Sequence, residues 1–505
     1  MKKQILSRSS FLKKAAAGGA AFALGSPLLD GVLSYAAEPN RPSRRAQDQN
    51  APDDKRPNII LAMTDDQGWA DTGYNSANNP ERDKVATPTM DAMAAAGLRF
   101  NRFYAQCPLC SPTRGSVMTG RHPFRYGTFS PGSPFRNQEL TIAQALKTAG
   151  YATGHFGKWH LSGVSGPGQP LLGDDPLSPG RFGFDEWFSV SNFFDRDWTF
   201  SRKGQLVQIP GDGSDAIMAE ALKFIGTAAQ NKTPFLAVIW YGNPHVPIEP
   251  TPEYQQKAGG SPYYGEIYGV DHSLGTLRSE LRRLGIAENT LIWFTSDNGG
   301  VPPYSVGGLR GKKGTVWEGG LRVPGIIEWP ARIRKRFVTD IPAVTSDIYP
   351  TILELVGVKM PSQVEPLDGI SLVPLLDGRM TERPKPIAFW HGGRGAKDSG
   401  HAALTSNQYK LHKLAPEKYE LYDLLNDPTE SKDLAAGHPD IVAQMKSSLL
   451  TWQDSVVKSL AGDDYPGGLS KDAVNTAAEF SATKYKNVRK TKGEKKSKKD
   501  KGSKK

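Results

Sequence analysis

The sequence predicts an α/β protein in which a large, mostly parallel sheet is flanked by helices and followed by a smaller C-terminal domain of antiparallel sheet and helix. Apolar runs rich in β-branched and aromatic residues recur at 58–63 (NIILAM), 235–241 (FLAVIWY) and 290–295 (TLIWFT). Their hydrophobicity is continuous rather than alternating, which is typical of parallel strands buried on both faces. Segments with helix start and stop signals lie between them, and such alternation predicts helices on both faces of one sheet.

Residues 1–36 are predicted to be a signal peptide and residues 37–56 a polar linker. The first segment begins with basic residues, continues as an Ala- and Gly-rich apolar run too short to span a bilayer, and ends in small residues. This is the order of a secretory signal. Residues 7–13 (SRSSFLK) resemble the twin-arginine export pattern, although Ser9 stands where the second arginine would be. We expect export to the periplasm or the extracellular space, and no later segment has the length and apolarity of a transmembrane helix.

Residues 57–380 are predicted to form the main α/β domain. Thr87 and Pro88 are typical of a helix start, and Gly97 is typical of its end. Residues 141–150 (TIAQALKTAG) have the same features, with a threonine at the start and a glycine at the end. These helices would alternate with the apolar strands and cover the sheet.

The pattern changes after residue 380, so residues 381–465 are predicted to form the smaller C-terminal domain. Short alternating stretches at 408–414 (QYKLHKL) and 419–424 (YELYDL) favour antiparallel strands. A helix is predicted after them, because apolar residues then recur every three or four positions. These residues are Ile441, Met445, Leu449, Trp452 and Val456.

The formal net charge of +11 is concentrated at the two ends of the chain. Residues 481–505 carry eleven Lys and one Arg against two acids, which is +10, and residues 1–36 carry +4, which leaves −3 for the rest. A nearly neutral body argues against a nucleic-acid-binding fold. Because the basic segment has almost no apolar residues, residues 466–505 are predicted to be a disordered, Lys-rich tail, either merely solvated or a tether to acidic polysaccharide or a membrane surface.

Acidic and amide side chains follow two of the predicted strands. Asp65 and Asp66 come after the first apolar run, and Asp297 and Asn298 come after the third. Ligands of open α/β sheets bind beyond the carboxyl ends of the strands, and an all-oxygen set suits Ca²⁺ or Mg²⁺ better than zinc. Either pair alone would favour helix caps or turns. The two pairs together, each with glycine close behind, predict a metal site.

Basic side chains are expected at the same edge of the sheet. Lys158 and His160 close the segment GYATGHFGKWH, His245 follows the second apolar run, and Lys313 lies beside Lys312 in RGKKG. A single histidine after a strand is usually structural. Several cations opposite a dication site instead suggest an oxyanion shared between them.

Both cysteines of the chain, Cys107 and Cys110, lie in the segment CPLCSPTRGSVMTGR (107–121). Their spacing allows a thioredoxin-like redox pair. It also allows a disulfide, which would close a loop too short to stabilise the fold much. A half-site for zinc would need further cysteines, which the chain lacks.

The same segment resembles the signature of the type I sulfatases, members of the alkaline phosphatase superfamily. The pattern Cys-x-Pro-x-Arg begins at Cys110, Thr-Gly-Arg follows at 119–121, and Thr113 stands where Ser is commoner. A second family pattern, Gly-Tyr-x-Thr leading to Gly-Lys-x-His, reads GYATGHFGKWH, and LRGKKGTVWEGGLRVP and YELYDLLNDPTESKDLA are also similar. The resemblance covers roughly residues 57–455. It implies an alkaline phosphatase-like fold with residues 57–380 as the catalytic domain.

The resemblance further implies that a separate maturation enzyme oxidises Cys110 to Cα-formylglycine, which would leave Cys107 a packed free thiol. The hydrated aldehyde would offer a hydroxyl group that attacks the sulfur of a sulfate ester. The helix following Pro112 would point its positive end at the anion. One Ca²⁺ ion would be bound by Asp65, Asp66, Asp297 and Asn298.

The remaining site residues take their expected roles from the resemblance as well. Arg114 and Lys158 would hold the modified residue and neutralise charge, and His160 would contact its second hydroxyl group. His245 and Lys313 would bind the sulfate and assist the leaving oxygen. The Arg-Gly-x-Lys spacing of the family favours Lys313 over the lysine before it.

We therefore predict an exported, calcium-dependent sulfatase that acts on sulfated carbohydrate more than on small aryl esters. Export, the basic tail and the aromatic and basic residues of 191–204 (SNFFDRDWTFSRKG) favour a carbohydrate, although these side chains fit core and loop surface equally well. Two alternatives stay open. One is a phosphonate or phosphate ester hydrolase on the same fold, and the other is a non-catalytic polyanion-binding protein in which Cys110 is unmodified.

Overall fold

The computed structural model describes residues 56–163, 171–360 and 362–470. The predicted signal peptide, nearly all of the predicted linker and the tail from residue 471 onward lie outside the described residues. Among the helices in the described ranges, none is both long and apolar enough to cross a membrane.

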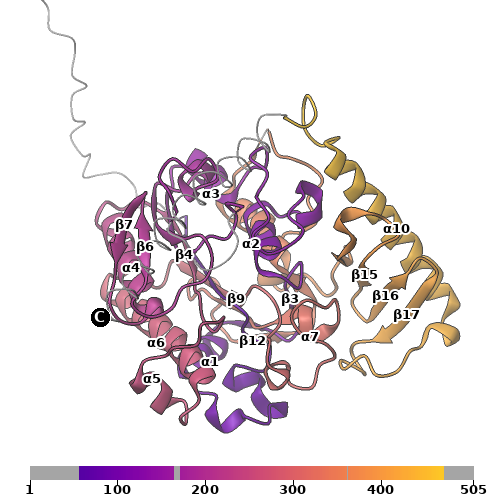
Figure 1. The fold of residues 1–505 in the computed structure, drawn as a ribbon, viewed down its shortest axis with the longest axis horizontal. Helices are drawn as coiled ribbons and strands as arrows, with labels where there is room; N and C mark the ends of the chain where they lie inside the picture. The colour runs from indigo at the N-terminus through magenta and orange to yellow at the C-terminus, as the bar shows by residue number, and fades with distance from the viewer. Residues whose placement is uncertain (1–55, 164–170, 361, 471–505) are drawn as a thin grey trace, which may run out of the picture. The chain divides into compact units, whose positions relative to one another are not determined.

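The main sheet of the described chain has ten strands, and its central strands β9, β1, β8, β4 and β5 are parallel. The prediction of a mostly parallel sheet with flanking helices is confirmed (Figure 1). Antiparallel strands extend it on both sides. In spatial order the strands are β12 (Phe337–Thr339), β2 (Leu98–Phe100), β11 (Gly325–Glu328), β9 (Thr290–Ser296), β1 (Asn58–Thr64), β8 (Phe235–Trp240), β4 (Ala152–Lys158), β5 (Glu186–Val190), β6 (Thr199–Arg202) and β7 (Gln205–Gln208).

The three apolar runs of the sequence form the neighbouring strands β1, β8 and β9 at the centre of this sheet. Alternate residues of β1 enter two separate cores. Ile59, Leu61 and Met63 join one core, and Ile60 and Ala62 join the other. Because both faces of the strand are covered, its hydrophobicity is continuous along the chain.

Helices cover both faces of the sheet, as predicted (Figure 1). Pro88 begins α1 and Gly97 follows its last residue, and Thr141 caps α3 in a capping box with Gln144. The core that contains Ile60 is shared by α1 (Pro88–Ala96), α4 (Gly213–Gln230) and α6 (Pro262–Arg283). The opposite core is shared by α2 (Cys110–Thr119), α3 (Ile142–Thr148) and α8 (Ile348–Val356).

Short elements connect these layers, and the sequence predicts none of them because such short runs carry no periodic hydrophobic pattern. A small sheet consists of β10 (Arg322–Val323), β3 (Phe103–Tyr104) and β13 (Ala343–Val344). The short α-helices are α5 (Pro252–Lys257), α7 (Glu318–Leu321) and α9 (Val373–Leu376). The 3₁₀ helices are η1 (Gly73–Asn78), η2 (Arg82–Lys84), η3 (Pro123–Tyr126), η4 (Pro179–Phe182), η5 (Pro303–Val306), η6 (Thr345–Asp347), η7 (Gly393–Gly395) and η8 (Ala435–Gly437).

The predicted C-terminal antiparallel sheet and helix are confirmed (Figure 1). All five apolar positions that predict the helix α10 (Pro439–Ala461) pack in the core beneath the sheet: Met445, Leu449 and Val456 are buried, and Ile441 and Trp452 are partly buried. The boundary at residue 380 stays a prediction. The strands are β14 (Ile387–His391), β15 (His401–Thr405), β16 (Tyr409–Ala415) and β17 (Lys418–Asp423).

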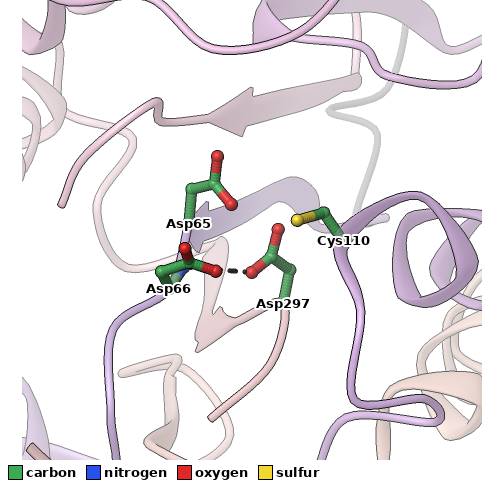
Figure 2. Close-up of side chains that lie close together, drawn as sticks. All are labelled: Asp65, Asp66, Cys110 and Asp297. Atoms are coloured by element: carbon green, nitrogen blue, oxygen red, sulfur yellow. Dashed lines mark hydrogen bonds between the residues drawn. The ribbon is translucent and has the colours of Figure 1, made fainter. Parts of the chain in front are cut away.

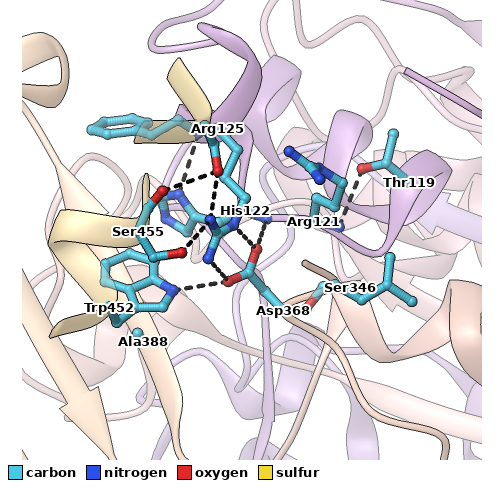
Figure 3. A network of polar contacts seen from close by, with 12 residues as sticks. Thr119, Arg121, His122, Arg125, Ser346, Asp368, Ala388, Trp452 and Ser455 are labelled. Atoms are coloured by element: carbon cyan, nitrogen blue, oxygen red, sulfur yellow. Dashed lines mark hydrogen bonds and ion pairs between the residues drawn. The ribbon is translucent and has the colours of Figure 1, made fainter. Parts of the chain in front are cut away.

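A buried ion pair between Arg125 and Asp368 lies against α10, which is hydrogen-bonded to both residues (Figure 3). Arg125 in η3 donates two hydrogen bonds to Asp368, at 2.7 and 2.9 Å, and Trp452 of α10 donates a third at 2.8 Å. Arg125 also donates to Ser455 of α10 at 2.9 Å. Burial alone would raise the pKa of Asp368, but Arg125 outweighs it and holds the pKa well below the usual value of an aspartate.

Replacing Asp368 with asparagine is expected to destabilise the fold by about 3–5 kcal/mol at neutral pH, because it leaves the buried Arg125 guanidinium uncompensated. The folded-state pKa is depressed, so the contribution of Asp368 is complete above the unfolded pKa of about 3.9 and is lost as the pH falls through the folded pKa. Urea unfolding of the wild-type protein and of Asp368→Asn from pH 7 downward measures this contribution. The difference between their free energies of unfolding should shrink below about pH 4.

The matched control is Asp377→Asn, which removes a carboxylate paired with Arg332 and Arg379 at a partly exposed position. Its expected cost is about 0–1 kcal/mol. Equal losses in the two variants would contradict a special contribution of the buried pair.

Candidate active site

Three carboxylates and Cys110 converge at the carboxyl edge of the sheet (Figure 2). β1 and β9 are parallel neighbours in which Thr64 is opposite Ser296, so the next residues, Asp65 and Asp297, leave the sheet side by side. Asp66 follows in a left-handed conformation with φ of 67°, and its N–H donates to Asp297 Oδ1 at 3.2 Å. One ligand atom from each of Asp65, Asp66, Asp297 and Cys110 lies within 4.8 Å of the others.

Asn298 completes the predicted metal set. Asn298 Nδ2 donates a hydrogen bond to Asp66 Oδ1 at 2.7 Å, and the side-chain carbonyl oxygen of Asn298 takes no part in this contact. Asn298 Oδ1 and Asp65 Oδ1 are both buried without a hydrogen-bond partner among the described residues. Buried acceptors without partners are costly, and carboxylate and amide oxygens are the donors that a hard dication takes. The residues present therefore fit Ca²⁺ or Mg²⁺.

Two buried cations face these carboxylates. Lys158, the last residue of β4, forms an ion pair with Asp65. Arg114, one turn after Cys110 on α2, donates to Asp297 Oδ2 at 2.7 Å and to the Lys158 carbonyl oxygen at 3.0 Å. Its guanidinium lies over the Trp240 ring, 5.1 Å from the centroid. All four charged side chains are fully buried, so their charges depend on one another.

The pKa values of the neighbouring carboxyl groups of Asp65 and Asp297 are shifted in opposite directions. Burial would raise the pKa of Asp65, but Lys158, followed by His245 and Arg114, lowers it well below the usual value. Burial and then the charge of Asp65 raise the pKa of Asp297 to about 7, although Arg114 opposes them. Two adjacent carboxylates resist simultaneous ionisation, and a cation bound between them would favour the ionised form of both.

Cys110 is the first residue of α2, so the helix begins at Cys110 and already includes Pro112, rather than beginning after Pro112 as expected. Burial, with the carboxylates of Asp65 and Asp297, raises the pKa of the Cys110 thiol to about 12 in spite of two nearby lysines. The thiol is therefore protonated at neutral pH and a poor nucleophile. Cys107 is buried as well, and both cysteines are free, which confirms a packed free thiol at Cys107.

His245 and Lys313 lie at the more open side of the site, with side chains 17% and 18% exposed. Lys313 Nζ donates to Asp66 Oδ2 at 2.7 Å, and His245 Nε2 lies 3.7 Å from the same oxygen. Lys312 is exposed, so the structure brings Lys313 rather than its neighbour to the carboxylates. Burial alone would lower the pKa of Lys313, but Cys110 and the three aspartates outweigh it and raise the pKa.

His160 follows β4 with a φ of 56° and is buried. Its backbone N–H donates to the Ser191 carbonyl oxygen at 2.9 Å, and its Nδ1 has no hydrogen-bond partner among the described residues. Burial, and then Lys158 and Arg114, lower its pKa well below the usual value. His160 therefore offers a neutral imidazole, which can donate and accept a proton at its two nitrogens.

Sequence reasoning missed several residues that support these side chains. The Phe193 ring stacks on His245, with centroids 5.3 Å apart and planes 18° apart. The backbone carbonyl oxygen of Asn243 accepts a hydrogen bond from the Asp65 N–H at 3.0 Å. The Gly314 N–H donates to the Pro108 carbonyl oxygen at 2.9 Å, which joins the Lys313 loop to the Cys110 loop. Phe193 lies in a segment singled out from the sequence, but its contact with His245 had no sequence signal.

Comparison with known families agrees with this geometry. Residues 57–358 match the family described as Sulfatase, and residues 311–455 match the family described as N-sulphoglucosamine sulphohydrolase, C-terminal. The chain belongs to the type I sulfatase family of the alkaline phosphatase superfamily. It is a sulfuric ester hydrolase, an enzyme that hydrolyses sulfate esters.

Individual relatives are similar over most of their length. The chain is 33% identical to N-acetylgalactosamine-6-sulfatase of Mus musculus over 397 residues, which cover 70% of this chain and 72% of that protein. It is 30% identical to arylsulfatase A of Homo sapiens over 451 residues, which cover 77% and 86%. A crystal structure of Ps i-CgsB in complex with k-i-k-neocarrahexaose matches with a TM-score of 0.70 and 26% identity, over 85% of this chain and 98% of that one.

Proposed function

We propose that the chain is an exported sulfatase that depends on formylglycine and calcium and acts on sulfated carbohydrate. The observation that carries this proposal is the convergence of Asp65, Asp66, Asp297 and Cys110 within 4.8 Å, with Cys110 at the head of the Cys-x-Pro-x-Arg pattern. A binding protein for polyanions would need neither an aldehyde precursor nor a buried set of metal ligands.

The four oxygen-bearing residues Asp65, Asp66, Asp297 and Asn298 would hold the calcium ion. When bound, the ion would supply positive charge that favours the deprotonated form of the attacking hydroxyl group. Arg114 and Lys158 hold the carboxylates of Asp297 and Asp65 in place, so these two cations preserve the ligand geometry and neutralise part of the buried charge.

Cys110 would act only after conversion to formylglycine, whose hydrated aldehyde supplies the hydroxyl nucleophile. The side chain is 1% exposed in the folded protein. A maturation enzyme must reach the Cys-x-Pro-x-Arg segment to modify it, so we expect conversion to precede folding of this region. The neutral imidazole of His160 is suited to exchange a proton with the modified residue.

His245 and Lys313 would contact the sulfate group from the open side of the site. Both side chains are partly exposed and both face Asp66, so an incoming anion meets a cation and an imidazole beside the metal ligands. A histidine at this position can protonate the oxygen of the departing alcohol, and a lysine can stabilise the charge that develops on it.

A carbohydrate substrate is supported by the relatives and by the segment 191–204. The mouse relative is named for a sulfated amino sugar, and Ps i-CgsB binds the oligosaccharide neocarrahexaose. In this chain the half-buried Phe193 ring stacks on the His245 imidazole, and the half-buried Trp198 ring contacts Phe193 in turn. Aromatic rings at the open side of a site suit the apolar faces of sugar rings. The order of residues 1–36 supports export.

The test combines the mass of a peptide with turnover. Tryptic peptide 103–114 of protein isolated from its native host should carry an aldehyde or its hydrate at Cys110. The same protein should hydrolyse sulfated sugars and 4-nitrophenyl sulfate faster than the matched phosphate esters. An unmodified thiol, or no turnover, would contradict the proposal, and faster cleavage of the phosphate esters would favour the phosphohydrolase alternative.

A further inference from the structure

Three buried carboxyl groups lie close together next to the loop of residues 243–249, which carries His245 and is called the His245 loop below. They have no part in the chemistry proposed above. Asp195 follows β5, Asp212 caps α4 and Glu266 lies in α6, and each is at most 4% exposed. Each retains one oxygen without a hydrogen-bond partner among the described residues. No lysine, arginine or histidine of the described chain forms an ion pair with any of them.

The other oxygens of two of these groups hold the His245 loop at both ends. Glu266 Oε2 accepts a hydrogen bond from Asn243 Nδ2. Asp195 Oδ2 accepts the backbone N–H of Glu249 at 3.0 Å. His245 lies between these two anchor points, so the position of the loop depends on both carboxyl groups.

Asn243 transmits this restraint to the metal site. Ser214 Oγ donates to Asn243 Oδ1 at 2.9 Å, so Glu266 and Ser214 hold the amide from opposite ends. The backbone carbonyl oxygen of Asn243 accepts a hydrogen bond from the Asp65 N–H at 3.0 Å. A shift of Asn243 would therefore move Asp65 and His245 together.

We propose that Glu266 is a positioning residue for sulfate ester hydrolysis, in which its carboxyl group accepts the Asn243 hydrogen bond, fixes Asn243 and thereby places Asp65 and His245. The inference rests on the proposed function, because it assumes that these two residues act in turnover. Glu266 itself does not touch the reacting atoms.

The surroundings of Glu266 favour the neutral form. Burial raises its pKa to about 9, and Asp195 and Asp212 add to the shift. Burial likewise raises the pKa of Asp195 to about 7 and that of Asp212 to about 6, and Asp215 contributes to the latter. A neutral carboxyl group can accept the Asn243 hydrogen bond through its carbonyl oxygen, and a glutamine side chain offers the same acceptor with nearly the same shape.

The test compares Glu266→Gln with Glu266→Leu. Glu266→Gln should keep kcat/KM for 4-nitrophenyl sulfate within a few-fold of the wild-type value. Glu266→Leu, which offers no acceptor, should lower it on the order of 10- to 100-fold, as expected for misplaced catalytic groups. Calcium titration calorimetry should show weaker binding in Glu266→Leu alone, because Asp65 is displaced only there.

Asp271→Leu is the control on the same helix. Asp271 is also buried, and its oxygens accept the N–H groups of Thr89 and Met90 at 2.9 and 2.8 Å, so it supports α1 rather than the His245 loop. It should lower the melting temperature as Glu266→Leu does, yet leave kcat/KM per folded molecule and calcium affinity unchanged.

Each contrary outcome is distinct. Wild-type kcat/KM and calcium affinity in Glu266→Leu would show that Glu266 positions nothing. Equal losses in Glu266→Gln and Glu266→Leu would show that a charged carboxylate or a cation bound to it is needed, and would overturn the neutral-carboxyl mechanism. Failure of the matured wild-type protein to hydrolyse any sulfate ester would refute the proposed function. Calcium affinity in Glu266→Leu would then still show whether Glu266 holds Asp65 in place.

Discussion

Replacing Cys110 with alanine is expected to abolish sulfate ester hydrolysis while leaving the fold intact. In the proposed mechanism Cys110 is the precursor of the nucleophile, and loss of a covalent nucleophile typically lowers kcat on the order of 10⁴- to 10⁶-fold. The side chain is buried but small, so its loss should cost only about 1 kcal/mol of stability. Turnover of 4-nitrophenyl sulfate and thermal unfolding are measured on protein produced together with a maturation enzyme.

Cys107→Ala is the matched control, because it removes the other buried thiol of the same segment. It should retain kcat within a few-fold, since Cys107 lies outside the cluster of ligand atoms. A redox function of the two cysteines predicts instead that both substitutions inactivate the protein equally. Ordinary sulfatase activity in Cys110→Ala would refute the assignment of the nucleophile.

The central sheet is predictable from the sequence because its strands are buried on both faces. Continuous apolar runs mark β1, β8 and β9, and the Thr-Pro and Gly signals mark the ends of α1. The antiparallel edges are not predictable in this way. Strands β2 and β12 have three residues each, and such short segments adopt their conformation from the neighbours with which they pair.

The candidate site is predictable as far as it follows from strand ends and family patterns. Asp65 and Asp297 meet because parallel strands end at the same edge of the sheet. The start of α2 at Cys110 was not predictable, because the N-cap residue is Leu109, and leucine has no side-chain acceptor with which to cap a helix. Asn243 and Glu266 were missed because their contact joins a loop to a helix, and no periodic pattern records such a pair.

Replacing Asp297 with alanine is expected to weaken calcium binding and turnover together, each by about 100-fold or more, since even residues that only support a ligand change metal affinity about 10- to 100-fold. Two effects combine. One carboxylate is removed from the cluster, and Arg114, which donates to Asp297 Oδ2 at 2.7 Å, loses its partner. Calcium titration calorimetry and kcat/KM for 4-nitrophenyl sulfate are measured on the same preparation.

Asp347→Ala separates the loss of a ligand from the loss of a buried ion pair. Asp347 is as buried as Asp297 and accepts two hydrogen bonds from Arg383, at 2.7 and 2.9 Å, outside the cluster of ligand atoms. Breaking this pair should cost about 3–5 kcal/mol of stability and leave calcium affinity unchanged in the folded protein. Both variants break a buried arginine pair, and Asp347→Ala also removes the acceptor of the Val344 and Ile370 N–H groups, so a loss of calcium affinity in Asp297→Ala alone points to coordination. Unchanged calcium affinity in Asp297→Ala would rule that residue out as a ligand.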